Sequence, residues 1–267
     1  MRHGEVTAMS LSEENIHLEV NNLFLSFDGV KAITDFSFKI KRGEICAIIG
    51  PNGAGKSSVL NVLNGIYRPS SGKIIFNGTH FKHFRPTQAA KDGIGRTFQH
   101  NALFPKMTVL NNVLTGLSQK STVTIFEHAL HLPRAVRQEK AFYERSLETI
   151  RFLGLHEHCN TVAETLPYGV QKLVGLARAL VSSPEMLLLD EPMAGMNAEE
   201  KKEMSRLVVA ISETLNVTII LIEHDIEVVT NLAKHVVVLD YGRKLADGRP
   251  EYVVNDPDVI ASYLGDR

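Results

Sequence analysis

The 267-residue chain has only two cysteines and almost no net charge, and each shortage excludes a class of protein. Cys46 and Cys159 stand alone, without the paired spacing of a metal site or a redox centre. We expect both to be buried small hydrophobic residues in a reducing compartment. The formal net charge of −1 argues against general nucleic-acid binding, so no nucleic-acid partner is expected.

Long apolar runs are also missing. No run reaches the ~18 residues that a membrane-spanning helix needs, and the N-terminus has no apolar stretch of the signal-peptide kind. Hydrophobic residues make up 44% of the chain and charged residues 22%, which is ample material for a globular core. The composition therefore predicts a cytosolic α/β protein.

One stretch, residues 50–57, reads GPNGAGKS and fits the pattern of a phosphate-binding loop. Its glycines permit backbone angles closed to other residues, so consecutive N–H groups can converge on one anion. Lys56 places a positive charge on the β- and γ-phosphates, and the Ser57 hydroxyl can ligate Mg²⁺. The loop residues expected to bind nucleotide are Gly50, Pro51, Asn52, Gly53, Ala54, Gly55, Lys56, Ser57 and Ser58.

The residues on either side of the loop support this assignment. Ile45–Ile49 is apolar and partly β-branched, as a buried parallel strand should be. Residues 58–63 have helical spacing, which puts the loop at a helix N-terminus, where the helix dipole favours phosphate. The chain is therefore predicted to bind a nucleoside triphosphate, and the absence of an internal repeat indicates a single nucleotide site.

Polar side chains at the ends of two later apolar runs can complete such a site. Asp190 and Glu191 follow a strand-like run, at the edge where open α/β sheets bind ligands. Asp190 is expected to hold Mg²⁺ through water, and Glu191 to act as general base for the water that attacks the γ-phosphate. His224, after the run 219–222, can contact the γ-phosphate, and the amide of Gln99 can reach Mg²⁺ or the attacking water.

The apolar and turn patterns in the rest of the sequence predict the strands and helices that carry these residues. Residues 1–16 are polar and weakly patterned, and we expect them to be an extension. Residues 17–22 and 34–40 indicate an antiparallel hairpin, and residues 71–78, which end in Asn-Gly, indicate another. From about residue 110 to 159 the chain is predicted to be helical, with amphipathic periodicity at 137–140 and 141–153. The α/β pattern then resumes, with strands at 186–189, 217–222 and 236–240 and a helix at 198–215.

Together these residues resemble an ATP-binding cassette (ABC), specifically the ATPase of a branched-chain amino acid importer. The resemblance covers nearly the whole chain after the N-terminal extension. It implies that residues 50–57 are the Walker A loop, Gln99 the Q-loop glutamine and His224 the switch histidine. It also implies that Asp190 and Glu191 end the Walker B strand, with Glu191 as the catalytic glutamate.

Three further stretches carry the same resemblance. Phe27 falls where the family has an aromatic that stacks on adenine, and Ala194–Asn197 matches the D-loop in the form used by that subfamily. Residues 246–265 resemble the subfamily's C-terminal tail. The implied fold is α/β: a P-loop NTPase (ABC ATPase) core with a mixed, largely parallel sheet, an antiparallel β subdomain and an inserted helical subdomain. The implied domains are an extension at 1–16, an ATPase domain at 17–250 with the helical subdomain at about 100–180, and the tail at 251–267.

The signature motif departs from the family pattern. Where cassettes usually have Leu-Ser-Gly-Gly-Gln, this chain has Leu166, Pro167, Tyr168, Gly169 and Val170. The family's serine contacts the γ-phosphate held by the other subunit, whereas Pro167 has neither a hydroxyl nor an N–H. The Tyr168 and Gly169 amides, at the start of a helix predicted at 168–180, can still receive the phosphate. One lost hydrogen bond to a charged group costs roughly 1.5–3 kcal/mol, which slows turnover about 10- to 100-fold.

The resemblance also implies partners. Two cassettes would enclose two ATP, with Mg²⁺, and drive a separate transmembrane permease that is supplied by a solute-binding protein. The chain would then lie on the cytoplasmic face of the inner membrane as a peripheral subunit. Whether the partner cassette is identical or homologous stays open, as do the solute and the direction of transport. Two alternatives are an ATPase for export of lipopolysaccharide or another hydrophobic cargo, and a slow nucleotide-gated switch, against which Glu191 argues.

Overall fold

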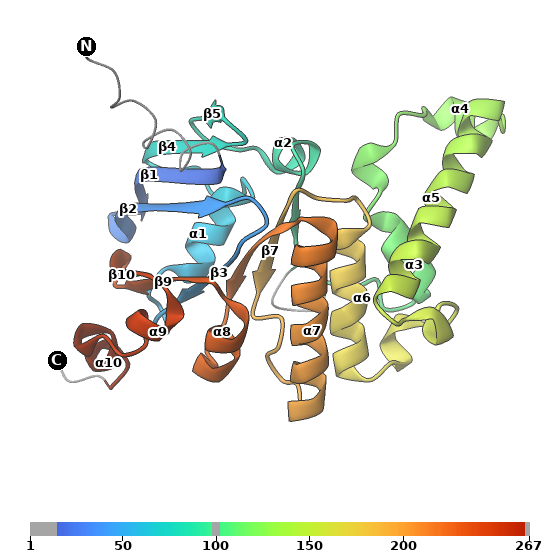
Figure 1. Ribbon diagram of the computed structural model, residues 1–267. Helices are drawn as coiled ribbons and strands as arrows, with labels where there is room; N and C mark the ends of the chain where they lie inside the picture. Colours follow the sequence, from blue (N-terminus) through green and yellow to red (C-terminus); the bar gives the residue numbers. More distant parts are fainter. Residues whose placement is uncertain (1–14, 98–101, 265–267) are drawn as a thin grey trace, which may run out of the picture. The chain divides into compact units, whose positions relative to one another are not determined.

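The computed structural model describes residues 15–97 and 102–264 (Figure 1). The chain divides into two compact units: unit 1 comprises Met1–Arg85 and Val209–Arg267, and unit 2 comprises Pro86–Val208. Both contain strands and helices, so the predicted α/β class is confirmed. None of the helices in the described ranges is long and apolar enough to cross a membrane.

An antiparallel sheet forms one part of unit 1. Its strands are β1 (Ile16–Phe27), β2 (Val30–Lys41), β4 (Ser71–Phe76) and β5 (Thr79–Phe81), in the order β2-β1-β4-β5. Phe36, Phe38 and Ile40 alternate with polar neighbours along β2 and are all buried, so one face of this strand lies in the core. Both predicted hairpins are confirmed, and the first is longer than its apolar pattern indicates.

The other strands of unit 1 position the phosphate loop. They are β3 (Ile45–Ile49), β8 (Thr218–Ile222), β9 (His235–Asp240) and β10 (Arg243–Gly248), in the order β10-β9-β3-β8. β3 runs parallel to both of its neighbours, and every residue of β3 and β8 is buried. This explains their continuous apolar sequences. The helices that lie wholly within this unit's described residues are α1 (Lys56–Leu63), α8 (Ile226–Leu232), α9 (Pro250–Val253) and α10 (Pro257–Leu264).

Unit 2 pairs two short parallel strands, β6 (Ile94–Arg96) and β7 (Met186–Asp190). Its helices are α2 (Pro86–Lys91), α3 (Val109–Thr115), α4 (Ile125–Ala129), α5 (Pro133–Phe152) and α6 (Tyr168–Leu180), with 3-10 turns at Ser118–Lys120, His156–His158 and Ala163–Thr165. The helix α7 (Ala198–Leu215) carries the chain from unit 2 into unit 1.

The helical stretch expected at about 110–159 is confirmed, but the start of its longest helix needs correction, as does the expected burial of Cys159. α5 begins at Pro133, four residues before the predicted amphipathic stretch that starts at 137, because proline suits the first turn of a helix even where the apolar periodicity is weak. Cys46 is buried as expected, but Cys159 is only half-buried, because it follows a short surface turn rather than occupying a strand.

A half-buried carboxylate in unit 1 should make stability depend on pH. The Asp247 carboxylate accepts hydrogen bonds from His235 Nε2 at 2.5 Å and Lys244 Nζ at 2.7 Å. Burial raises the pKa of Asp247, but these two partners lower it by more, so its pKa lies below the ordinary value. A group with a depressed folded-state pKa stabilises the protein above its unfolded pKa of about 3.9, and this contribution is lost as the pH falls through the folded-state pKa.

We therefore expect Asp247→Asn to lower the free energy of unfolding by about 1 kcal/mol at pH 7. The difference from the wild type should shrink as the pH falls below about 4. Urea unfolding of both proteins at pH 7 and at pH 3.5 measures it, with Asp258→Asn as an exposed control. A difference that stays constant with pH would contradict the electrostatic origin.

Candidate functional site

The phosphate loop lies between β3 and α1 in unit 1, as its sequence predicts. Gly50, Gly53 and Gly55 all have positive φ, at 142°, 81° and 103°. A Cβ on Gly50 would lie 2.0 Å from the Leu239 carbonyl oxygen, and one on Gly55 would lie 2.7 Å from that of Ala32, so packing forbids a side chain at both positions. Gly53 has no atom within 4 Å of such a Cβ, so this part of the loop is open to a ligand.

The Lys56 side chain folds back over the loop that precedes it. Its Nζ donates to the carbonyl oxygens of Gly50 at 2.7 Å and Pro51 at 2.9 Å, and the residue is buried. Gly55 caps α1 without a side-chain hydrogen bond, so the first turn of the helix presents backbone N–H groups. The ammonium and the helix terminus therefore lie at the same loop, an arrangement that suits phosphate.

The remaining loop residues differ in exposure. Asn52 and Ser57 are exposed, while Pro51 and Ser58 are half-buried. Ala54 is buried, and its carbonyl oxygen accepts a hydrogen bond from the Gly242 amide at 2.9 Å. This bond ties the loop to the turn between β9 and β10.

Phe27, the expected adenine-stacking residue, is the last residue of β1 and is 42% exposed. Its ring meets the ring of Tyr67 edge-on, with centroids 4.9 Å apart and planes at 72°. An edge contact of this kind orients the Phe27 ring without covering both of its faces. The sequence reasoning missed Tyr67, which only tertiary packing brings to Phe27.

His224 lies on the link between β8 and α8 and is exposed. β3 and β8 are parallel, with Ile48 opposite Ile222, so both strands end at the same edge of unit 1. The next residue, Asp225, caps α8 by accepting a hydrogen bond from the Val228 amide at 3.4 Å. The strand end therefore brings His224 to the same edge of unit 1 as the phosphate loop, as its position in the sequence indicates.

In unit 2, Asp190 ends β7 and is held by a cation that the sequence reasoning missed. Arg96 Nη2 lies 3.1 Å from Asp190 Oδ2, and both side chains are only 5% exposed. Arg96 ends β6, which pairs with β7 in parallel register. The guanidinium fixes the direction of this buried carboxylate, and losing either partner would leave an uncompensated buried charge.

Glu191 follows Asp190 with a φ of 48°, a backbone conformation uncommon for residues other than glycine. Its carbonyl oxygen accepts a hydrogen bond from Lys172 Nζ at 3.3 Å. Lys172 also lies over the ring of Tyr168, 5.6 Å from its centroid. A cation from α6 thus supports the backbone at the expected catalytic glutamate, and such strained positions are common at functional sites.

The motif that departs from the family signature lies at the start of α6. α6 begins at Tyr168 as predicted, and Pro167 is its N-cap, with no side-chain capping bond. The Pro167 carbonyl oxygen accepts a hydrogen bond from the Gln171 amide at 3.0 Å. A Cβ on Gly169 would lie only 2.4 Å from Glu200 Oε1, so a carboxylate from α7 approaches the first turn of α6. The sequence reasoning missed Glu200 as well.

Some predicted residues have no structural description. Gln99 lies outside the described residues, as do most of the N-terminal extension and the last three residues of the tail. The D-loop, Ala194–Asn197, is described: a Cβ on Gly195 would lie 3.0 Å from the Tyr168 ring. At its end Asn197 exchanges hydrogen bonds with Glu200 and thereby caps α7.

Comparison with known proteins assigns the family. Residues 33–194 match the family model described as ABC transporter, which is more than half of the chain. Residues 243–267 match a model described as branched-chain amino acid ATP-binding cassette transporter. The high-affinity branched-chain amino acid transport ATP-binding protein LivG of Salmonella typhimurium is 40% identical, over 93% of this chain and 98% of LivG. BraF of Pseudomonas aeruginosa, with the same description, is 36% identical over the same shares.

Solved structures agree with this assignment. One described as a nucleotide-free ATP-binding cassette from an ABC transporter has a TM-score of 0.83 and 29% identity, covering 94% of this chain and all of that chain. The structure of cbiO1 from Clostridium perfringens, part of the ABC transporter complex cbiONQ, has a TM-score of 0.78 and 31% identity, covering 95% and 96%. The resemblance read from the motifs is therefore confirmed, and the chain belongs to the ABC transporter family as one of its ATP-binding cassettes.

Proposed function

We propose that this chain is the ATP-hydrolysing cassette of an importer for branched-chain amino acids. The observation that carries this choice of cargo is the match of residues 243–267 to the branched-chain amino acid cassette model. The rest of a cassette discriminates less, since a spermidine/putrescine import ATP-binding protein of Mycoplasma capricolum is also 32% identical over 94% of this chain. The reaction converts ATP and water into ADP, phosphate and a proton.

In unit 1 the nucleotide would lie on the phosphate loop, with its adenine against Phe27. Lys56 Nζ would exchange its bonds to the Gly50 and Pro51 carbonyl oxygens for bonds to the β- and γ-phosphates. His224, which follows β8 at the same edge of unit 1, would contact the γ-phosphate. The open face at Gly53 leaves room for the phosphates to approach the backbone.

In unit 2 Glu191 would accept the proton of the attacking water, assisted by Gln99. Phosphoryl transfer depends mainly on positioning and on charge stabilisation, so the groups that hold these side chains matter as much as the base. Arg96 fixes the Asp190 carboxylate, and Lys172 fixes the backbone at Glu191. We assign both cations as positioning residues.

The chemistry of the side chains fits Mg²⁺ as the cofactor. The Ser57 hydroxyl and the Asp190 carboxylate are oxygen donors, which Mg²⁺ prefers, and the amide oxygen of Gln99 would be a third. The guanidinium on Asp190 Oδ2 disfavours direct contact between that oxygen and a cation, so we propose that Asp190 acts through a bound water. When bound, Mg²⁺ would neutralise charge on the phosphates.

A second cassette, identical or homologous, would supply the signature contact to each ATP. The segment Leu166–Val170 can offer the backbone N–H groups at the start of α6, but not a hydroxyl, because its N-cap is Pro167. Glu200 beside Gly169 adds a negative charge close to the position that would receive a phosphate. Both features support a weakened signature rather than an inactive one.

The other partners follow from the same proposal. The relatives are ATP-binding proteins of transport systems, which implies membrane permease subunits. We propose in addition a solute-binding protein outside the membrane and a peripheral location at its cytoplasmic face. We further propose an ATPase domain at residues 17–250, with a helical subdomain at about 100–180, because α3 to α6 all belong to unit 2. Residues 251–267 would be the subfamily tail.

Reconstitution with the permease tests the proposal. The complex in lipid vesicles should hydrolyse ATP with Mg²⁺ and accumulate leucine, isoleucine or valine when the solute-binding protein is added. Hydrolysis without uptake of these solutes would refute the cargo and leave the ATPase. ATP-dependent dimerisation without hydrolysis would refute the motor and favour the slow switch. Export from the vesicle interior would refute the direction.

Changing the signature proline should increase turnover. Pro167→Ser restores both a hydroxyl and a backbone N–H, so we expect ATP hydrolysis to rise about tenfold. Serine can also cap α6, which should raise the free energy of unfolding by about 1 kcal/mol. Phosphate release and urea unfolding measure the two effects, with the exposed Pro105→Ser as control. An unchanged rate in a stably folded variant would mean that Pro167 does not limit turnover.

A further inference from the structure

The short helix α4 in unit 2 is amphipathic, but its apolar face is exposed rather than buried. At 100° per residue, Ile125, Phe126, Ala129 and Leu130 lie within an arc of about 140°. All four are exposed: the side chain of Ile125 is 84% accessible, that of Phe126 80% and that of Leu130 70%. We call these four residues the α4 patch. A helix of a globular protein normally turns such an arc toward the core, so this orientation calls for an external partner.

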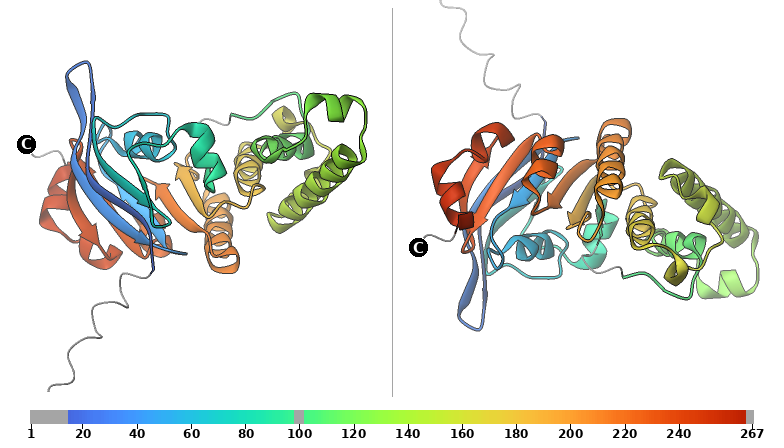
Figure 2. Two further views of the ribbon diagram at one scale, coloured as in Figure 1. Left: turned by 90° about the horizontal axis from the view of Figure 1, so that it is seen from above. Right: turned by 90° about the horizontal axis from the view of Figure 1, so that it is seen from below.

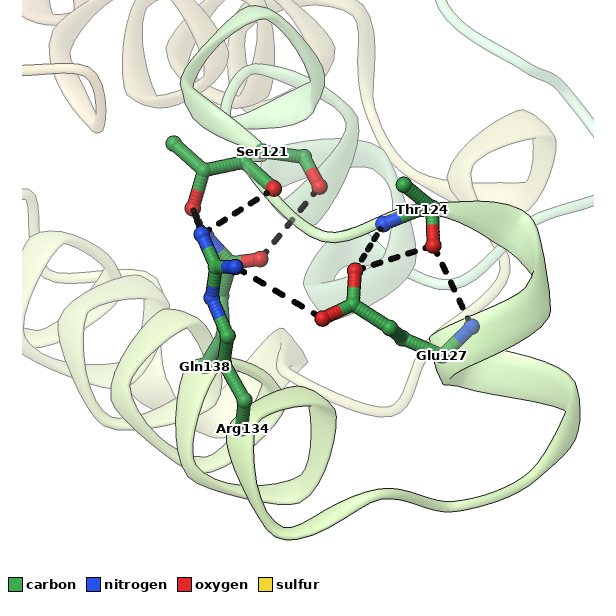
Figure 3. A network of polar contacts seen from close by, with 6 residues as sticks. Ser121, Thr124, Glu127, Arg134 and Gln138 are labelled. Atoms are coloured by element: carbon green, nitrogen blue, oxygen red, sulfur yellow. Dashed lines mark hydrogen bonds and ion pairs between the residues drawn. The ribbon is translucent and has the colours of Figure 1, made fainter.

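The polar face of α4 holds the patch outward. Glu127 and Thr124 form a reciprocal capping box, and Glu127 Oε1 also lies 3.6 Å from Arg134 Nη1 on α5 (Figure 3). His128 Nδ1 lies 3.3 Å from Glu139 Oε1, also on α5. The backbone N–H of Thr124 and then its hydroxyl lower the pKa of Glu127, so this carboxylate stays charged.

The same network ties the approach to α4 onto α5. Ser121 Oγ donates to Gln138 Oε1 at 3.4 Å, and Arg134 Nη2 donates to the Thr122 carbonyl oxygen at 3.3 Å. α4 and α5 lie side by side in both views of Figure 2. The orientation of α4 is therefore set by several polar contacts, and the patch is not a frayed end that could turn inward.

The segment that carries the patch is rich in positive charge. Residues 118–140 contain four Lys or Arg and two Glu, in a chain whose formal net charge is −1. Arg134 is paired with Glu127, but for Lys120 and Arg137, both exposed, the described residues offer no carboxylate within ion-pair distance. Exposed apolar side chains in a segment with an excess of exposed cations are the composition of a segment that lies in a membrane interface.

The size of the patch selects between a membrane and a protein as its partner. A stable protein interface uses about 20–30 residues on each side, far more than α4 offers. Shallow insertion of a few apolar side chains between lipid headgroups needs only a small patch, and basic residues strengthen it on anionic lipid. We propose that the α4 patch contacts the surface of an anionic lipid bilayer, inserting Ile125, Phe126 and Leu130 among the headgroups while Lys120 and Arg137 face the lipid charges.

This contact goes beyond ATP hydrolysis and transport, because it requires neither nucleotide nor permease. It assigns a lipid-facing role to one helix of unit 2. It can be tested on the purified full-length chain alone.

The chain contains no tryptophan, so a single introduced tryptophan reports on its own environment. We expect the emission of Phe126→Trp to shift to the blue when vesicles of phosphatidylglycerol and phosphatidylcholine are added, and much less with phosphatidylcholine alone. Tyr252→Trp is the matched control, because Tyr252 is an aromatic of similar exposure, 75%, in unit 1. No shift at position 126, or an equal shift at position 252, would overturn the proposal.

Cosedimentation with the same vesicles separates the two contributions. The double variant Ile125→Ser, Phe126→Ser should bind at least about tenfold more weakly, whereas Tyr252→Ser should bind like the wild type. Lys120→Gln with Arg137→Gln should remove the preference for anionic lipid, and high salt should have the same effect. Wild-type binding by the serine double variant would overturn the proposal. So would an effect of these serine changes seen only when permease is present, which would make the partner a protein.

Discussion

Replacing Glu191 with glutamine should lower ATP turnover by about 10²- to 10⁴-fold, the range that general-base catalysis supplies. Glutamine keeps the size and the hydrogen-bonding reach of the side chain but cannot accept the proton of the attacking water. Nucleotide binding should persist, since Lys56 and the loop glycines are unchanged. Phosphate release under single-turnover conditions measures the loss.

The same variant should accumulate an ATP-bound dimer, because hydrolysis is the step that reopens paired cassettes. Size-exclusion chromatography with ATP and Mg²⁺ detects this species. Glu199→Gln is the matched control: Glu199 is an exposed carboxylate in the first turn of α7, and its loss should leave turnover within twofold of the wild type. Turnover by Glu191→Gln at the wild-type rate would exclude Glu191 as the base and require another acceptor.

Replacing Lys56 with alanine should weaken ATP binding about 10- to 100-fold, since one charge-assisted interaction with phosphate contributes roughly 1.5–3 kcal/mol. Turnover should fall further, because the charge that develops on the γ-phosphate in the transition state loses the same partner. Fluorescent nucleotide titration and phosphate release measure the two effects.

Two further variants show whether charge or geometry accounts for this loss. Lys56→Arg should also fail, because the ammonium lies buried within 2.9 Å of two loop carbonyl oxygens and a planar guanidinium does not fit that position. Lys73→Ala, at an exposed lysine of β4, should behave like the wild type. Full activity in Lys56→Arg would mean that only the charge matters, and that the observed loop geometry does not constrain the site.

Motifs with local causes could be read directly from the sequence. Positive φ at Gly50 and Gly55 follows from a pattern that needs glycine, and α1 follows from its helical spacing. The helices α6 and α7 begin and end at the predicted residues, because α6 follows a proline and both keep a regular apolar spacing. In parallel strands the carboxyl ends share an edge, so it was predictable that His224 follows β8 at the same edge as the phosphate loop.

Contacts between distant segments could not be read in this way. Arg96 and Asp190 are 94 positions apart, and their ion pair exists because β6 and β7 happen to be neighbours. Lys172 lies 19 positions before Glu191, whose carbonyl oxygen it contacts. No spacing rule links these side chains, because the pairing of two strands and the packing of a helix against a loop depend on how the whole core packs.

The sequence by itself determined the nucleotide-binding loop, the strands and helices with a clear apolar pattern, and the family, because each depends on local backbone preference or on a short contiguous motif. Only the tertiary structure decided which cations support Asp190 and Glu191, and that Glu200 approaches Gly169. It also decided that α4 turns its apolar arc outward. Amphipathic spacing predicts that a helix has an apolar face, but the direction of that face depends on polar partners such as Arg134, which tertiary packing supplies.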